Sequence, residues 1–161
     1  MKIRKARSDD IDEIYDVFIT LLETEDQASK KVGKAFLEVR TRRKDFEKSA
    51  KRAILKQIKK KKDLFLVAEE NKIIGYCCGS IKQEHKEFFI PMWTGYVKAL
   101  SIKKEAQGKG LGSVLMDEME KWFKLKKCKL VYLHVFANNP AVKFYKKRAY
   151  KELCYFLGKE L

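Results

Sequence analysis

The sequence predicts an α/β sandwich, in which helices pack around a mixed β-sheet. Three observations predict it: helical periodicity early in the chain, a hairpin pattern in the middle, and alternating strand-like and helix-like segments toward the end. That succession is typical of helices layered on a sheet. The length of 161 residues corresponds to one globular domain, so we expect a single domain over residues 1–161.

The first segments combine a short strand with two helical stretches. Ile3 and its neighbours form a short extended start, and Ser8-Asp9-Asp10 supply polar caps for a helix. The apolar residues that follow at helical spacing are Ile11, Ile14, Val17, Phe18, Leu21 and Leu22. A second helical stretch is expected over roughly residues 34–62, where apolar residues stand among many cations.

A change of periodicity in the middle of the chain predicts a β-hairpin. Residues 64–69 are an apolar run, Asn71-Lys72 supply a turn, and residues 73–78 resume extended chain. Residues 83–93 are polar and then aromatic, which favours either a loop or a strand end. Another strand is expected over residues 95–102.

The last part of the chain alternates helices and strands. A glycine-rich turn precedes an amphipathic helix over residues 111–126. Residues 130–135 form an apolar strand that we expect to be covered on both faces. Pro140 is well placed to start a short helix over residues 141–148. Residues 153–157 are expected to close the chain as a last strand.

The composition excludes several classes of protein. Hydrophobic residues make up 45% of the chain and aromatic residues 12%, enough to bury a core, which excludes a disordered protein. No apolar run reaches the roughly 18 residues that a membrane helix needs. No apolar stretch follows the basic residues 1–7, as it would in a secretory signal. We therefore expect a cytoplasmic protein that does not contact a membrane.

The net charge is strongly positive. Thirty-seven Lys and Arg against 22 Asp and Glu leave +15, a field that attracts anions such as nucleic acid or phosphorylated ligands. Between Arg40 and Asp63 there are twelve Lys and Arg and three Asp and Glu, a local +9. This stretch is either a solvated helix face or a surface for an anionic partner, and the sequence does not separate the two.

The cysteines and histidines do not predict a metal site. No C-x-x-C pair occurs, and His85 and His134 lie far apart in the sequence. Cys77 and Cys78 are adjacent, so on a strand they point to opposite faces. We expect all four cysteines to be small, buried, reduced thiols: Cys77, Cys78, Cys128 and Cys154.

One glycine-rich segment carries most of the chemical information. It is Gln107-Gly108-Lys109-Gly110-Leu111-Gly112-Ser113, between an expected strand and an expected helix. Glycine lets the backbone turn tightly and approach a ligand without a Cβ in the way. The helix that starts here directs free amide N–H groups into the turn, which predicts a cradle for a phosphate or pyrophosphate. Its spacing matches neither the P-loop nor the dinucleotide fingerprint.

Two motifs resemble those of the GNAT family of acetyl-CoA-dependent N-acetyltransferases. Gln107, Gly110 and Gly112 fill the fixed positions of its pyrophosphate loop, Q/R-x-x-G-x-G/A. Residues 138–145 are similar to its N-x-x-A-x-x-F-Y segment, and the likeness extends in order over nearly the whole chain. Ala149 departs from the pattern, because the family usually has a helix-capping glycine there, with φ > 0.

The resemblance implies a mixed, mostly antiparallel central sheet with helices on both faces. It implies acetyl-CoA as co-substrate, no metal, and a primary amine of a small molecule or protein that attacks the thioester directly in a ternary complex. The residues implied to bind the cofactor are Leu100, Ser101, Ile102, Gln107, Gly108, Lys109, Gly110, Leu111, Gly112, Ser113, Asn138, Ala141 and Tyr145.

The resemblance also implies two catalytic positions. A backbone N–H near Leu100 would stabilise charge on the carbonyl oxygen, and Tyr145 would protonate the departing thiolate. The general base stays open, because Tyr96 stands near the position where many relatives carry glutamate. The alternatives are Tyr96, Glu84, His85, Glu87, His134 or a water chain.

Two other functions are compatible with the sequence. One is a non-catalytic CoA-binding regulatory module, which would keep the loop without transferring the acetyl group. The other is a nucleic-acid-binding protein that uses the basic helix 40–62. A homodimer is compatible with the strand edges of this layout.

Overall fold

The computed structural model describes residues 1–84 and 90–159. The chain divides into two compact units. The first consists of residues 1–21 and 45–133, and the second of residues 22–44 and 134–161. Each unit has its own internal packing.

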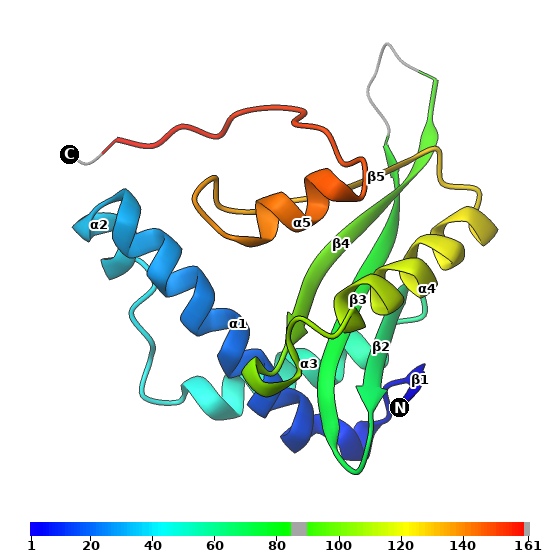
Figure 1. Ribbon diagram of the computed structural model, residues 1–161, viewed down its shortest axis with the longest axis horizontal. Helices are drawn as coiled ribbons and strands as arrows, with labels where there is room; N and C mark the ends of the chain where they lie inside the picture. Colours follow the sequence, from blue (N-terminus) through cyan, green and yellow to red (C-terminus); the bar gives the residue numbers. More distant parts are fainter. Residues whose placement is uncertain (85–89, 160–161) are drawn as a thin grey trace. The chain divides into compact units, whose positions relative to one another are not determined.

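The first unit is built on a five-stranded sheet in the order β1-β2-β3-β4-β5 (Figure 1). Its strands are β1 (Lys2–Lys5), β2 (Asp63–Glu69), β3 (Ile73–Glu84), β4 (Met92–Ile102) and β5 (Leu130–Leu133). The first four strands pair antiparallel, and β5 runs parallel to β4. The mixed, mostly antiparallel sheet is confirmed, and so is the β2–β3 hairpin.

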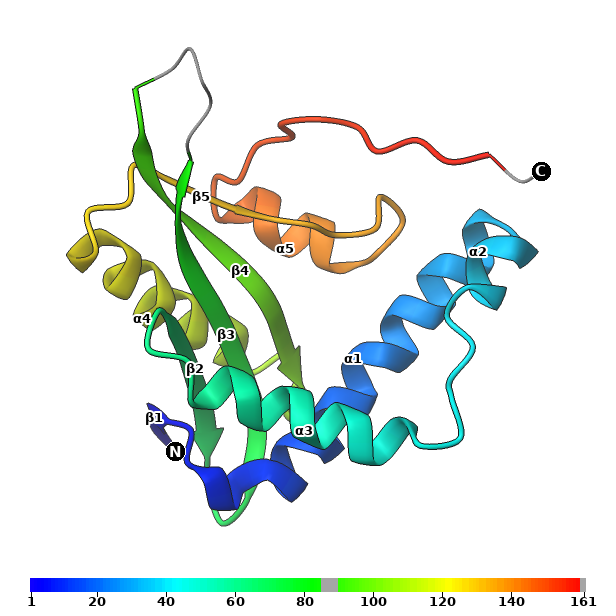
Figure 2. The ribbon, with the colours of Figure 1, turned by 180° about the vertical axis from the view of Figure 1, so that it is seen from behind.

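Helices cover both faces of this sheet. They are α1 (Ile11–Val32), of which the first unit holds the first half, α3 (Phe46–Ile58) and α4 (Leu111–Leu125). In Figure 1 α4 lies in front of the sheet, and in Figure 2, seen from behind, α3 does. The core between the sheet, α1 and α3 consists of Ile14, Val17, Ile54, Phe65, Val67, Ile73, Tyr76 and Cys78.

The opposite face of the sheet packs closely on α4 through two glycines. A Cβ on Gly79 would lie 2.8 Å from the ring of Phe123, and one on Gly95 would lie 2.5 Å from it. Phe123 is fully buried at this contact. Only glycine therefore allows α4 to approach the middle of β3 and β4 this closely.

The second unit is held by polar contacts onto α1. Its helices are the C-terminal part of α1, α2 (Lys34–Glu38) and α5 (Ala141–Lys147). Arg40 donates to Glu25 at 2.7 Å and to Asp26 at 2.8 Å. The side-chain amide of Asn138 donates to the carbonyl oxygen of Ala28 at 2.9 Å. Through these contacts the segment after α2 and the segment before α5 are both bound to α1.

The single helix expected over residues 34–62 is wrong. α2 ends at Glu38 and α3 begins at Phe46. Arg40 and Arg42 lie between them and both pair with Asp26, Arg42 at 2.6 Å. Crowded cations disfavour a helix, and here the acids of α1 stabilise an irregular connection instead.

The last strand expected over residues 153–157 is also wrong. This segment forms no strand in the described structure, and Tyr155 is 81% exposed and Leu157 88% exposed. An apolar run becomes a strand only where a neighbouring edge accepts its hydrogen bonds. Residues 153–157 thus have the composition of a strand but pair with no other strand in the described structure.

Two smaller expectations need correction. The strand expected over residues 130–135 ends at Leu133, and Leu130 is 47% exposed, so it is not covered on both faces. Cys154 is exposed and Cys128 is partly exposed, so these two are not buried thiols. Cys77 and Cys78 are buried on opposite faces as predicted, and burial raises the pKa of the Cys78 thiol to about 12.

Candidate active site

The connection from β4 to α4 is a compact turn tied to the end of the sheet. The amide N–H of Lys103 donates to the carbonyl oxygen of Ile74 at 2.9 Å, and a short 3₁₀ turn follows over Lys104–Ala106. The side-chain amide of Gln107 then donates to the carbonyl oxygen of Ile102 at 2.9 Å. The glycine loop therefore starts from a fixed point on β4.

Two glycines of this loop have left-handed backbone conformations. Gly108 has φ 78° and Gly110, the N-cap of α4, has φ 79°. A Cβ built on either would meet no other atom of the described chain within 4 Å. Glycine is required here by the backbone angle, and the space that a side chain would fill is open for a ligand.

The start of α4 leaves amide groups without backbone partners. Ser113 and Val114 donate to the carbonyl oxygen of Gly110 at 3.0 and 3.2 Å. Within the described residues, no amide from Gly108 to Gly112 donates a backbone hydrogen bond. Such amides at the positive end of a helix of 15 residues form a binding site for an anion. The arrangement fits a diphosphate group.

The second half of β4 has an open edge beside the same loop. β5 pairs with β4 only between Thr94 and Val97, and the ladder goes no further in the described structure. Alternate N–H and C=O groups of β4 beyond Val97, including those near Leu100, thus face away from β3 without a strand partner. The hydroxyl of Ser101 donates to the carbonyl oxygen of Val17 at 2.9 Å, so that side chain stabilises α1 against the sheet.

The segment before α5 is ordered by its two asparagines. Asn138 contacts Ala28, as described above, and Asn139 accepts a hydrogen bond from the amide of Ala141 at 2.8 Å. Asn139 is only 8% exposed. Its side chain therefore closes the turn before α5. An asparagine directly before proline is the signal that could have shown it.

Tyr145 lies in an aromatic cluster at the end of α5. Its ring is 5.2 Å from that of Phe144 and 5.7 Å from that of Tyr150, in edge-to-face geometry. The amide of Tyr150 donates to the carbonyl oxygen of Tyr145 at 3.1 Å, and Ala149 donates to Lys146 at 3.0 Å. This is a Schellman motif, and its left-handed residue is Ala149, with φ 64°. Ala149 therefore has the positive φ at the position where the family usually has a glycine.

Comparison with known proteins identifies the family. The model of the acetyltransferase (GNAT) family matches residues 29–150. The chain belongs to the GNAT family of acetyltransferases. The family uses acetyl-CoA as its co-substrate, and the loop before α4 lies in the matched region.

Individual relatives agree with this membership. N-alpha-acetyltransferase 60 of Danio rerio is 32% identical over 95 residues, 50% of this chain and 39% of that protein. An uncharacterized N-acetyltransferase of Methanocaldococcus jannaschii is 30% identical over 92 residues, 55% of this chain and 53% of that protein. The chain thus spans about half the length, or less, of these curated relatives.

A solved structure shows the same fold over the full length. A tetramutant of a Bacillus halodurans protein, BH1408, superposes with a TM-score of 0.84 at 18% identity and covers 100% of both chains. None of the helices in the described part of this chain combines the length and hydropathy that a membrane span requires.

The predicted site residues of this GNAT chain fall into both units. Leu100, Ser101, Ile102 and residues 107–113 lie at one end of the sheet in the first unit. Asn138, Ala141 and Tyr145 lie together around the start and body of α5 in the second unit. Among residues 1–84 and 90–159, no group of three or more His, Cys, Asp or Glu could hold a metal ion.

The candidates for the general base of this GNAT chain differ in their surroundings. Tyr96 lies on β4 with its ring 5.2 Å from that of Tyr132, and burial raises its pKa, which keeps the phenol protonated at neutral pH. His134 is exposed, directly after β5. His85, Glu87 and the side chain of Glu84 lie outside the described residues.

Proposed function

We propose that this chain is an N-acetyltransferase that moves an acetyl group from acetyl-CoA to a primary amine by direct attack in a ternary complex. The observation that carries the proposal is the loop from Gly108 to Gly112, whose amides are open at the start of α4. Family membership supports it independently.

The loop fits the diphosphate of coenzyme A. The amides from Gly108 to Gly112 would donate to its oxygens, and Lys109 would add positive charge. The open edge of β4 beyond Val97 would extend the site toward the reactive end of the cofactor. When bound, acetyl-CoA supplies an activated thioester.

Two groups of this chain would then assist the transfer. A backbone N–H near Leu100 would donate to the thioester carbonyl oxygen as negative charge develops on it. The hydroxyl of Tyr145 would protonate the departing thiolate, since a phenol is protonated at neutral pH. Both assignments follow from the positions of these residues in the family motifs.

The acceptor that best matches this chain is an α-amino group. An α-amine has a pKa of about 7.7 to 8.0, while a lysine amine has a pKa of about 10.4. β4 carries no Asp, Glu or His between Met92 and Ile102, and its tyrosine is protonated. An acceptor that is partly neutral at pH 7 needs the least help from a base. The name of the Danio rerio relative, an N-alpha-acetyltransferase, supports the same choice.

A product assay tests this proposal. The protein is incubated with acetyl-CoA and a panel of peptides with free N-termini, peptides with only lysine amines, and small amines, and products are identified by mass spectrometry. Acetylation of free N-termini, with intersecting initial-rate lines for the two substrates, is expected. Binding of acetyl-CoA without any product would instead indicate the regulatory module, and absence of binding would overturn both functions.

A further inference from the structure

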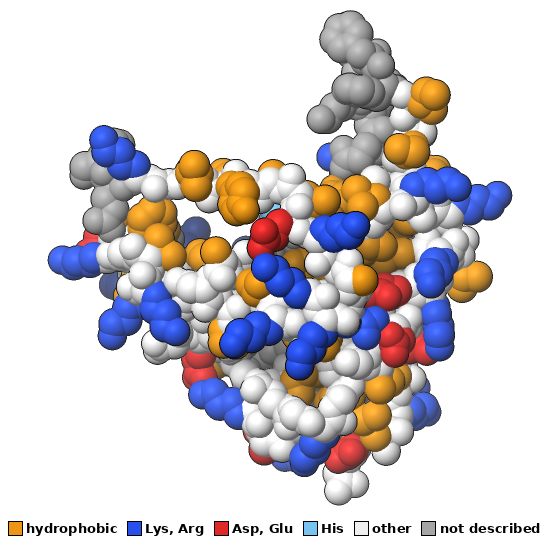
Figure 3. All heavy atoms as spheres, turned by 45° about the horizontal axis from the view of Figure 1, so that its top comes forward, with side chains coloured by type: hydrophobic (Ala, Val, Ile, Leu, Met, Phe, Trp, Pro, Cys, Tyr) orange, Lys and Arg blue, Asp and Glu red, His pale blue; other side chains and the backbone are white. Residues whose placement is uncertain are grey.

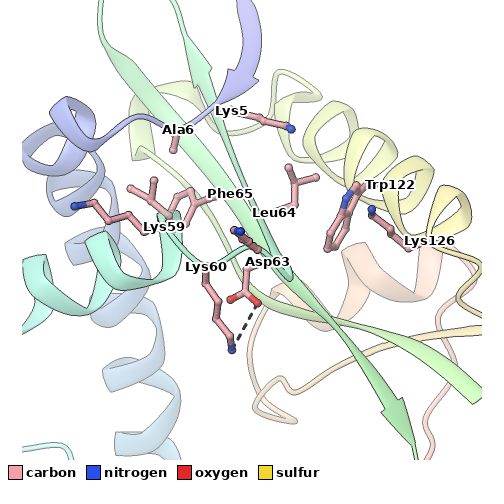
Figure 4. A pocket seen from close by; sticks show the side chains of 11 residues that line it. Lys5, Ala6, Lys59, Lys60, Asp63, Leu64, Phe65, Trp122 and Lys126 are labelled. Carbon is pink, nitrogen blue, oxygen red and sulfur yellow. Dashed lines mark ion pairs between the residues drawn. The ribbon is translucent and has the colours of Figure 1, made fainter.

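A pocket with a volume of about 290 Å³ lies in the first unit, at the end of α4 opposite the glycine loop (Figure 4). It is lined by the end of β1, the end of α3, the start of β2, and Trp122 and Lys126 of the α4 terminus. From Gly110 to Lys126 the helical rise amounts to roughly 24 Å. The pocket is therefore distinct from the predicted cofactor site.

The pocket concentrates positive charge from three separate segments. Five lysines line it: Lys5, Lys59, Lys60, Lys61 and Lys126. Among the described residues only Lys60 has an acidic partner, Asp63 at 3.8 Å. The other four form no ion pair with any described residue. This site thus has four ammonium groups that no described residue neutralises.

Two cations elsewhere in the first unit, Arg4 and Lys51, each have two acidic partners. Arg4, close by on β1, pairs with Asp10 at 2.7 Å and Glu69 at 2.8 Å. Lys51 on α3 pairs with Asp12 at 2.7 Å and Glu47 at 2.6 Å. Lysines at the C-terminal ends of helices complement the helix dipole, which accounts for Lys59 and Lys126. The helix dipole does not explain why lysines from β1 and from the turn before β2 line the same cavity.

The one acid in the pocket has an oxygen that accepts no hydrogen bond. The side chain of Asp63 is 1% exposed, and its Oδ2 accepts from Lys98 at 2.5 Å. Its Oδ1 is buried, lies 3.8 Å from the ammonium of Lys60, and has no hydrogen-bond partner in the described structure. In Figure 4 this carboxylate faces the amine of Lys60 at the pocket. A hydroxyl or amino group of a ligand would satisfy Oδ1.

Apolar side chains complete the walls. Leu64, Phe65 and the partly exposed indole of Trp122 lie among the lysines. A flat ring packs well against an indole, and phosphate oxygens pair well with ammonium groups. We propose that this pocket binds a nucleotide unit, with its phosphate on the lysines, a hydroxyl or amino group on Asp63 Oδ1 and its base on Trp122. The unit is either a free nucleotide or part of a single-stranded nucleic acid.

The fluorescence of Trp122 provides the test of this proposal. The chain has two tryptophans, so Trp93→Phe leaves Trp122 as the sole indole reporter. This variant is titrated with ATP and, separately, with a single-stranded oligonucleotide, and inner-filter-corrected fluorescence is followed. We expect saturable quenching that weakens with salt. In the Lys59→Gln/Lys61→Gln double variant, affinity should fall at least about tenfold.

Two control variants make the outcome decisive. Lys44→Gln/Lys48→Gln removes the same charge from exposed positions outside the pocket, and Lys109→Gln changes the glycine loop; both should retain the quenching and its midpoint. ATP binding would identify a free nucleotide, and binding of the oligonucleotide alone would identify a nucleic acid strand. No quenching by either probe, or equal weakening in the Lys44→Gln/Lys48→Gln control, would overturn the proposal. The product assay above is independent of this result.

Discussion

The side chain of Gln107 holds the carbonyl oxygen of Ile102 at 2.9 Å. This bond connects the last residue of β4 to the first residue of the glycine loop across the 3₁₀ turn Lys104–Ala106. The side chain of Gln107, the first residue of the family motif, thus contacts the backbone of this chain. Its contribution is to fix where the loop leaves the sheet.

Gln107→Leu should weaken coenzyme A binding without unfolding the protein. The lost hydrogen bond is exposed, so the stability cost should be about 1 kcal/mol or less, while the loop loses its fixed start. We expect coenzyme A affinity, measured by calorimetry, to fall about fivefold or more. Gln83→Leu, an exposed glutamine on β3, is the control and should bind normally. Unchanged affinity in Gln107→Leu would contradict a positioning role.

Gly110→Val should abolish coenzyme A binding while the protein stays folded. The substitution costs roughly 1–3 kcal/mol of backbone strain at φ 79°, and its side chain would enter the space where a diphosphate is proposed. Circular dichroism checks the fold and calorimetry the binding. The control is Lys127→Val, which also places valine at a positive φ, 59°, at the other end of α4, and should still bind. Retained affinity in Gly110→Val would remove the basis of the proposed cradle.

Tyr145→Phe should lower turnover about tenfold to a thousandfold and leave acetyl-CoA affinity nearly unchanged. The variant removes only the hydroxyl and keeps the edge-to-face contacts with Phe144 and Tyr150. Steady-state rates and binding are measured in parallel. Tyr150→Phe, in the same cluster, should turn over normally. An unchanged rate in Tyr145→Phe would mean that another group protonates the thiolate.

Ala149→Gly should stabilise the protein by up to about 1 kcal/mol, because glycine adopts φ 64° without the Cβ strain that alanine has there. Urea unfolding at 25 °C measures the effect. Ala50→Gly inside α3 is the opposite control and should destabilise by about 0.5–1 kcal/mol. Equal destabilisation by both substitutions would show that Ala149 carries no strain.

Asp10 should contribute stability that disappears in acid. Its hydrogen bonds to Arg4 hold its pKa below the ordinary value of 3.8. A lowered carboxyl pKa stabilises the fold above the ordinary value, and this contribution is lost as the pH falls from there through the folded-state pKa. Asp10→Asn should therefore unfold at lower urea concentration than wild type at pH 7, with a smaller difference at pH 3. A difference that is the same at both values would exclude this linkage.

The sequence locates a basic stretch over residues 40–62, and the structure shows what several of its cations contact. Lys and Arg side chains are spread over the face drawn in Figure 3, with fewer acids among them. Within the basic stretch, Arg40 and Arg42 pair with acids of α1, while Lys59 and Lys61 line the pocket beside α4. The acids of α1 and the residues of α4 are distant from this stretch in the sequence. The residues next to each cation therefore do not indicate what it contacts.

Local chemistry encodes most of the elements of this protein. Periodicity was sufficient to predict the β2–β3 hairpin and α4, because each buries one face over many residues. Gly108 and Gly110 mark backbone conformations that other residues adopt only with strain. Long-range pairing decided the rest. Residues 153–157 have strand composition and no paired edge, and β5 leaves β4 after Val97. Hydrogen bonds between strands and ion pairs between helices join residues that are far apart in the chain, so they depend on the folded arrangement and not on any local pattern.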